Sequence, residues 1–165
     1  MAPDYRNRTG SFNRQVGGRD AGFTLIELMM TIVILSILVS IALPMYLRQV
    51  RESRRTDART ALMDLAGREE RYYATNNSYS NSASALGYGS LSWPVSVGSG
   101  FYTIARPTIP DPNATAPSFA IVASPVAGKG QDRDTTCASF TIESTGKQSA
   151  LDSSGADQSS TCWGQ

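Results

Sequence analysis

The sequence predicts an α+β protein in which a long N-terminal helix packs on an antiparallel β-sheet. Residues 23–43 form a nearly continuous apolar run, and residues 47–75 follow it with an amphipathic helical pattern. Residues 101–106, 118–123 and 138–144 each alternate apolar or aromatic with polar side chains, as half-buried strands do. Packing one face of such a sheet on the amphipathic helix is the simplest layer arrangement for this order of elements.

Composition argues against most enzymatic functions. The 165 residues carry 15 basic and 14 acidic side chains, so the formal net charge is only +1. The sequence has no histidine and two cysteines, which excludes histidine-based general base catalysis and a four-ligand structural zinc site. The serines lack a Gly-x-Ser-x-Gly motif. We therefore expect a protein that is not an enzyme, with no cofactor and no metal.

The apolar run is long enough to cross a bilayer. At about 1.5 Å per residue, a helix over 23–43 spans roughly 30 Å, the hydrocarbon thickness of a membrane. We expect this helix to extend over residues 23–46, with a kink at Pro44. Glu27 is its one charge, and a carboxylate in a span costs roughly 2.5–3.5 kcal/mol, so a functional role is expected. The alternative is a tolerated charge that reaches the interface.

Charge placement favours a cytoplasmic N-terminus. Four arginines against two aspartates precede the apolar run, and positive flanks tend to stay inside. Four arginines just after the run weaken this argument: Arg48, Arg51, Arg54 and Arg55.

The junction Gly22-Phe23-Thr24-Leu25-Ile26-Glu27 resembles the processing motif of type IV prepilins. The resemblance implies a leader over residues 1–22, cleavage of the Gly22–Phe23 bond by prepilin peptidase, and N-methylation of Phe23. It also implies that Glu27 pairs with the terminal amine of a neighbouring subunit during assembly. The leader is long for this group, and an alternative start at Val16 would shorten it to seven residues. An ordinary secretory signal cut near residues 40–42 is the rival interpretation.

Residues 47–75 combine an apolar face with many charges of both signs. The apolar face consists of Ala58, Ala61, Leu62, Leu65 and Tyr72. The Asp64–Arg68 pair has favourable i,i+4 spacing, whereas Arg55 and Arg59 repel each other at the same spacing. A solvated mixed face is the simpler interpretation, and an arginine cluster for phosphate is the alternative.

The remaining chain, residues 76–165, is predicted to form a head with a loop over 76–100 and a sheet and cysteine-bounded region over 101–165. The helix end over 68–79 and the order of residues from Cys137 to Cys162-Trp163 resemble PilE/ComP-like minor pilins. That resemblance implies the type IV pilin fold and a C-terminal disulfide between Cys137 and Cys162, which an oxidising periplasm would favour. Two unpaired thiols are the alternative.

Four aspartates of the C-terminal region are candidate calcium ligands: Asp132, Asp134, Asp152 and Asp157. Their spacing matches no defined calcium loop, so a role in turns is the simpler interpretation.

The expected function is that of a structural subunit of a type IV pilus, with the properties of a minor pilin. The expected partners are prepilin peptidase, other pilin subunits, the inner-membrane assembly machinery and the membrane. We expect a single-pass inner-membrane protein with a periplasmic head that then enters the extracellular fibre. A DNA receptor and a type II secretion pseudopilin are the alternatives. We expect no nucleic acid partner, since cleavage leaves 11 basic and 12 acidic residues and only four cations follow Asn76.

Overall fold

The computed structural model describes residues 22–89, 92–111 and 114–164. The chain divides into two compact units, residues 1–41 and residues 42–165, and each is described by itself. The expected leader and the alternative start at Val16 lie outside the described residues, apart from Gly22.

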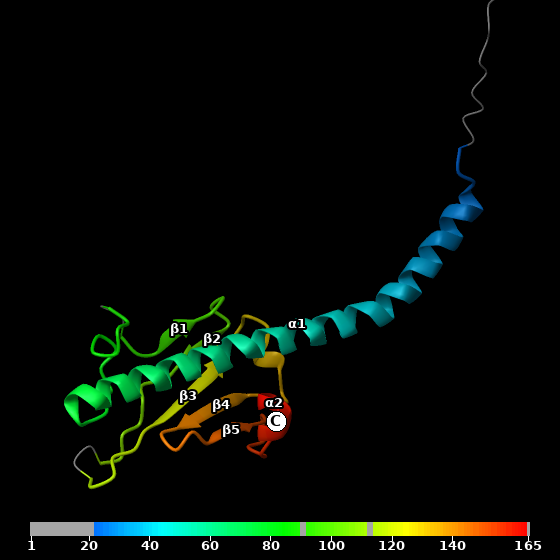
Figure 1. The fold of residues 1–165 in the computed structure, drawn as a ribbon. Coiled ribbons are helices and arrows are strands. Elements are labelled where there is room, and N and C mark those ends of the chain that lie inside the picture. The colour runs from blue at the N-terminus through cyan, green and yellow to red at the C-terminus, as the bar shows by residue number, and fades with distance from the viewer. Residues whose placement is uncertain (1–21, 90–91, 112–113, 165) are drawn as a thin grey trace, which may run out of the picture. The chain divides into compact units, whose positions relative to one another are not determined.

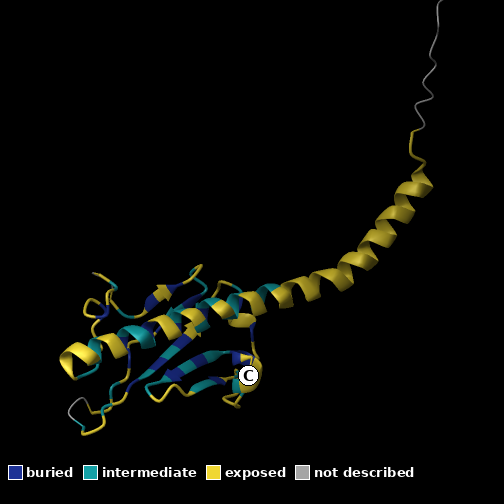
Figure 2. Ribbon diagram, viewed as in Figure 1, coloured by how far each residue is buried: buried dark blue, intermediate teal, exposed yellow. Residues whose placement is uncertain are grey.

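The first unit is built on the beginning of helix α1, which runs from Leu25 to Asn76 (Figure 1). Every described residue of this unit is exposed, as the colouring of Figure 2 shows. Its hydroxyl groups bond back to the helix, since Thr31, Ser36 and Ser40 donate to backbone carbonyls three residues earlier at 2.7–2.9 Å. By length and composition, α1 is the one helix among the described residues that could cross a membrane.

In the second unit, α1 buries one stripe of its surface. Ala58, Leu62 and Leu65 are fully buried at i, i+4 and i+7, which confirms the predicted apolar face. The helix continues through Pro44 and ends at Asn76, one residue beyond the expected bound. Asn77 follows with φ of 53°, the left-handed conformation in which many helices terminate.

Five antiparallel strands form one sheet in the order β1-β2-β3-β4-β5, each paired with its neighbour in sequence. Three strands match expected segments, while the sheet also extends at both edges beyond them. The strands are β1 (Val95–Val97), β2 (Tyr102–Ile104), β3 (Ala120–Pro125), β4 (Ser139–Glu143) and β5 (Gln148–Leu151). Strand β1 lies in the range 76–100, which the sequence predicts to be a loop. The sequence does not predict this strand because a three-residue Val-Ser-Val segment is too short to show a clear alternation.

The core lies between α1 and the sheet. Tyr102, Ile104, Ile121 and Phe140 are fully buried in the same cluster as the apolar stripe of α1. Two short helices complete the head: η1 (Gln131–Arg133) and α2 (Ser159–Trp163). Their positions bring the 128–136 segment and the C-terminus to the end of the sheet where β4 begins (Figure 1).

Candidate functional sites at the helix start and at an arginine pocket

The processing motif lies directly before and in the first turn of α1. Gly22, Phe23 and Thr24 precede the helix, and Glu27 lies within its first turn. The backbone N–H of Glu27 donates to the Thr24 hydroxyl at 3.2 Å, which caps one of the free amides of the helix start. The Glu27 carboxylate lies at the end of the helix dipole that favours negative charge.

Phe23 and Glu27 border the same shallow hollow of about 280 Å³, together with Leu28 and Thr31. Phe23 is 81% exposed. Glu27 lies four residues further on, in the first turn of α1, and lines the same hollow.

Residues 25–47 expose almost all of their apolar side chains. Seventeen large apolar side chains are exposed here, and they cannot remain in water at low cost, since burying one side chain of this kind is worth about 1.5–3 kcal/mol. This surface needs an apolar environment, and a lipid bilayer or the apolar helices of other subunits would supply it.

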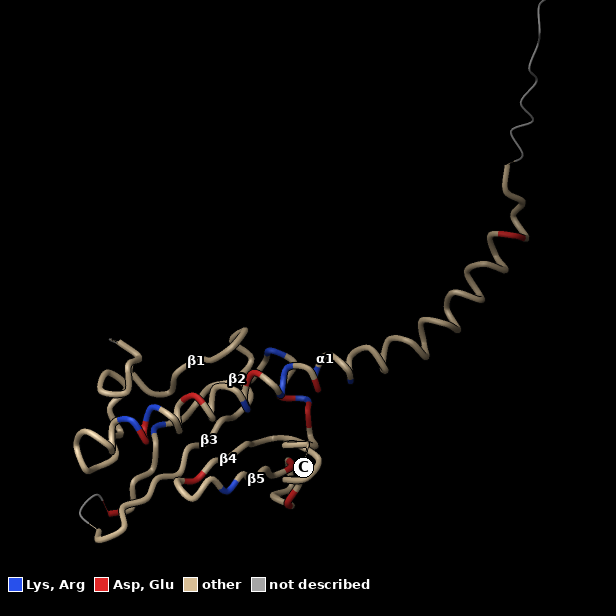
Figure 3. The backbone as a smooth tube through the Cα atoms, viewed as in Figure 1, with Lys and Arg blue, Asp and Glu red and all other residues tan. Residues whose placement is uncertain are grey.

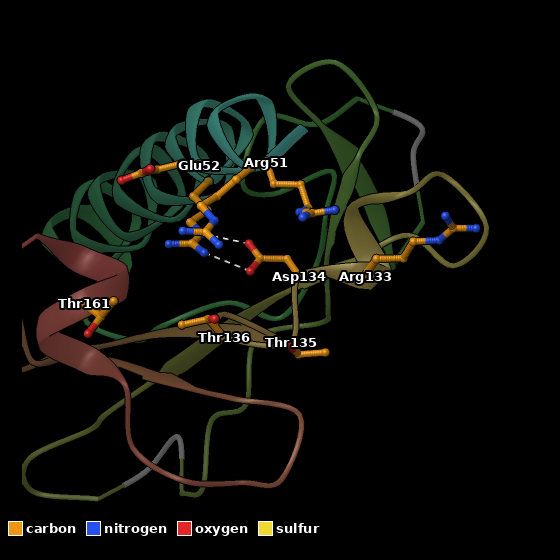
Figure 4. Close-up of a pocket in the computed structure, with 9 residues that line it drawn as sticks. Arg51, Glu52, Arg133, Asp134, Thr135, Thr136 and Thr161 are labelled. Atoms are coloured by element: carbon orange, nitrogen blue, oxygen red, sulfur yellow. Dashed lines mark hydrogen bonds and ion pairs between the residues drawn. The ribbon is translucent and has the colours of Figure 1, made fainter. Parts of the chain in front are cut away.

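The second unit has another candidate site, a pocket of about 430 Å³ between the beginning of its part of α1 and the segment that precedes β4 (Figure 4). Its wall is rich in arginine and threonine. The lining residues are Arg48, Arg51, Glu52, Arg55, Arg133, Asp134, Thr135, Thr136 and Thr161.

Arg55 and Asp134 form the floor of this pocket through a two-point ion pair. The Arg55 Nε and Nη2 atoms donate to the two Asp134 carboxylate oxygens at 2.7 and 2.8 Å. The Asp134 side chain is only 4% exposed, so the pair is largely desolvated. Its hydrogen bonds raise the pKa of Arg55 above the ordinary value. Arg55 is thereby used within the fold, and it does not remain free to bind a ligand.

Gln131 fixes the loop that carries this pair. The buried Gln131 amide donates to the Tyr102 hydroxyl at 2.9 Å, to the Arg51 carbonyl at 3.1 Å and to Asp134 at 3.2 Å. These bonds tie η1 to α1 and to β2. Burial also raises the pKa of Tyr102 to about 12, so this hydroxyl stays protonated as a neutral partner.

Two cationic side chains outside the pocket, Arg54 and Lys129, each contact the turn between β1 and β2. The Arg54 guanidinium lies 3.6 Å from the centre of the Phe101 ring, and the Lys129 ammonium donates to the Gly100 carbonyl at 3.0 Å. The structure therefore brings cations from α1 and from the head to the same end of the sheet. In Figure 3 the basic residues of α1 lie along its second half, some near the loop that precedes β4 and others near the C-terminal end of the helix.

The C-terminal region has the expected disulfide, between Cys137 and Cys162. This bond joins Cys137, two residues before β4, to helix α2 and excludes the alternative of two free thiols. The Trp163 indole N–H donates to the Ser149 carbonyl at 2.9 Å, so α2 is also fastened to β5.

The four aspartates considered as candidate calcium ligands form an ion pair or hydrogen bonds within the protein instead. Asp134 pairs with Arg55, and Asp132 accepts the Gly128 N–H at 3.0 Å. Asp152 accepts from Ser154 and Ala156, and Asp157 accepts from Ser159. No group of three or more potential metal ligands comes together in the part of the chain that the structure describes.

The arginine pocket was only partly visible in the sequence. The sequence offers an arginine cluster for phosphate as an alternative interpretation of the charged 47–75 helix, and Arg48, Arg51 and Arg55 of the pocket belong to that helix. Arg133 and the threonines reach the pocket only through the fold. The Asp64–Arg68 ion pair, at 2.7 Å, forms as predicted. Arg55 and Arg59, which are expected to repel each other, bond to different partners: Arg55 pairs with Asp134, and Arg59 donates to the Trp163 carbonyl at 3.2 Å.

Comparison with known proteins places the chain in a class and then in a family. Residues 18–43 match the prokaryotic N-terminal methylation motif, the signature of prepilins. Residues 44–141 match a family described as type IV minor pilin ComP, DNA uptake sequence receptor. Since that match covers more than half of the chain, the protein belongs to the ComP family of type IV minor pilins.

Two curated relatives are major pilin subunits. The chain is 34% identical over 70 residues to the type IV major pilin protein PilA of Myxococcus xanthus, which covers 42% of the chain and 32% of that protein. It is 38% identical over 77 residues to the type IV wide pilus major component PilA4 of Thermus thermophilus, which covers 46% of the chain and 59% of that protein. The chain therefore spans less than two thirds of the length of either relative.

Proposed function

We propose that this protein is a minor pilin that acts as a DNA receptor within a type IV pilus. The observation that carries this proposal is the ComP family match over residues 44–141, which includes the second half of α1 and most of the sheet. The similarity to two major pilins supports a role as a subunit of a pilus fibre. The description of the matching family as a DNA uptake sequence receptor supports a role in DNA binding.

Assembly in this proposal begins at the N-terminal motif. Prepilin peptidase cuts the Gly22–Phe23 bond and the new amine of Phe23 is methylated. Helix residues 23–46 then anchor the subunit in the inner membrane, with the head over 76–165 in the periplasm. When the assembly machinery moves the subunit into the fibre, Glu27 pairs with the terminal amine of a neighbour. The match at 18–43 and the exposed apolar surface of α1 support this route.

The low net charge of the chain is a weaker argument against DNA binding than the sequence indicated. Backbone phosphates respond to local clusters of cations, because each neutralised phosphate releases its counterion. Arg54 and Lys129 are far apart in sequence, yet both contact the Gly100-Phe101 turn. We therefore propose this turn as one of the places where DNA phosphates contact the head.

The test is retention of a short DNA duplex by the full-length processed protein in neutral detergent micelles, over a range of salt concentrations. The wild type is expected to bind at low salt and to weaken steeply as salt rises. The double variant R54Q/K129Q is expected to reduce the slope of log K against log salt by roughly 2, about one for each lost phosphate contact.

The control variant R106Q/K147Q removes the same charge at the opposite end of the sheet. Arg106 follows β2, and Lys147 precedes β5, both at the end remote from the Gly100 turn. Its salt slope should stay near that of the wild type. Absence of DNA binding by the wild type at low salt would contradict the receptor proposal. Equal slopes for the two double variants would contradict the assignment of the turn.

A further inference from the structure

The arginine pocket holds more positive charge than its own structure uses. Arg55 is neutralised by Asp134, which leaves Arg48, Arg51 and Arg133 against Glu52. Figure 4 shows Arg51 and Arg133 on one side of Asp134 and Glu52 on the opposite side. The pocket therefore has an excess of positive charge that no other described side chain in its lining balances.

The chemistry of the lining suits a phosphate group. Arginine presents planar N–H donors that match two phosphate oxygens at once, and these charge-assisted bonds are among the strongest in proteins. Thr135, Thr136 and Thr161 add hydroxyl donors to the same wall. Because Asp134 is already paired with Arg55, it presents no free carboxylate charge to repel an anion.

The position of the pocket indicates where that phosphate comes from. Within the second unit, residues 42–165, the exposed residues Leu43, Met45, Tyr46 and Leu47 directly precede Arg48 on α1. Apolar residues followed by tyrosine and then by arginine are typical of the border between hydrocarbon and headgroups, where aromatic rings and long cations settle. Arg48 and Arg51 are within a turn of that border, since a helix advances about 1.5 Å per residue.

Arginines at this place are otherwise difficult to explain. In the proposed orientation they follow the span on the periplasmic side, where positive residues near a span are normally depleted. A ligand that uses their charge would account for them. DNA phosphates share the chemistry, but the apolar residues beside the pocket favour a ligand that is part of the bilayer.

We propose that the pocket formed by Arg48, Arg51, Arg133 and the three threonines binds the phosphate of an anionic phospholipid in the periplasmic leaflet. This inference rests on the proposed membrane insertion, but it does not depend on the DNA receptor. The bound lipid would hold the head at the membrane surface while the subunit waits to be assembled. Movement into the fibre would then require release of the lipid.

The test uses native mass spectrometry of the processed protein, released from neutral detergent micelles. The measured quantity is the lipid that stays bound to the protein after this release. Phosphatidylglycerol is the probe, phosphatidylcholine is the zwitterionic comparison and inorganic phosphate is a competitor. The wild type is expected to retain one phosphatidylglycerol in preference to phosphatidylcholine. The double variant R51Q/R133Q should bind it roughly a hundredfold more weakly, because two charge-assisted contacts are lost.

R106Q/K147Q is the matched control, with the same loss of charge at the other end of the sheet. It should retain phosphatidylglycerol like the wild type. Thermal unfolding of each variant shows whether the head is intact, and the single variant R133Q, at an exposed position, replaces the double variant if the latter unfolds.

Three results would overturn the inference: equal retention by the wild type and the R51Q/R133Q variant, equal loss in R51Q/R133Q and the control, or displacement of the lipid by a short DNA duplex. The last result would assign the pocket to DNA. Failure of the DNA experiment above would leave lipid retention unchanged, so the two proposals fail separately.

Discussion

Glu69 is a buried carboxyl group on α1, beneath the segment that follows the helix. It is fully buried, and its Oε2 atom accepts the Ser80 N–H at 3.0 Å. The other oxygen has no hydrogen-bond partner among the described residues. Burial, opposed by the Ser80 hydrogen bond and aided by the charge of Glu70, raises the pKa of Glu69 to about 7. The neutral acid is therefore the form that the fold favours.

This residue predicts a pH dependence of stability with a definite sign. Because the pKa of Glu69 is near 4.5 when unfolded and about 7 when folded, the folded protein holds the proton more tightly between these values. The contribution of this group is greatest below pH 4.5 and declines as pH rises through 7. The free energy of unfolding should lose roughly 2–3 kcal/mol from this source between pH 5 and pH 8.

The variant E69Q should remove that decline, because glutamine keeps an acceptor for Ser80 without the charge. Chemical unfolding of E69Q at pH 5 and pH 8 measures it against the wild type. Glu70 is the neighbouring control, since it is exposed and bonded to the Tyr79 hydroxyl at 3.0 Å. E70Q should keep most of the wild-type pH dependence, and a wild-type dependence preserved in E69Q would count against this explanation.

The turn between β1 and β2 meets α1 at Gly98 and Asp57. Gly98 has φ of 56°, and a Cβ atom placed there would lie 2.6 Å from the Cβ of Asp57. The Asp57 carboxylate accepts the neighbouring Ser99 N–H at 3.2 Å. Glycine is therefore required both by its left-handed backbone and by the close approach of the helix.

Substitution of Gly98 by alanine should destabilise the head beyond the cost of the backbone conformation alone. Gly155 provides the matched comparison, since its φ is 86° and no atom lies within 4 Å of its added Cβ. We expect about 1 kcal/mol of lost stability for G155A and at least about 2 kcal/mol for G98A. Chemical unfolding of both variants measures the difference, and equal losses would show that the contact with Asp57 contributes nothing.

The elements that sequence reasoning found are those with a strong local pattern. The period of Ala58, Leu62 and Leu65 identifies the buried face of α1, and the alternation in β3 and β4 identifies central strands. Strands β1 and β5 are short edges, and β5, Gln148–Leu151, consists mainly of polar or small residues. Their strand structure comes from pairing with β2 and β4, which no local pattern records.

The candidate sites divide in the same way. The Gly22-Phe23-Glu27 motif is contiguous, so it is visible in the sequence without knowledge of the fold. The arginine pocket and the Arg54–Lys129 pair join residues of α1 to the 128–136 segment across the head. The Arg55–Asp134 ion pair also decides which arginines remain available, and this can be determined only from the folded structure.

At the scale of the whole molecule, the two units need different surroundings. The exposed apolar part of α1 needs an apolar environment, whereas the packed head is suited to water. The first unit has a fully exposed apolar helix, whereas the second unit has its own core and disulfide. A membrane and then a fibre of similar helices would cover the first unit in turn. The charge of Glu27 in this apolar surface is acceptable once an amine is available as its partner.

The most direct measurement is the intact mass and N-terminal sequence of the protein recovered from envelope membranes. The account predicts a chain that begins at N-methylated Phe23 and retains the Cys137–Cys162 disulfide. A chain that begins at Leu43, or one that keeps its leader, would contradict the account, because the amine proposed to pair with Glu27 would not exist.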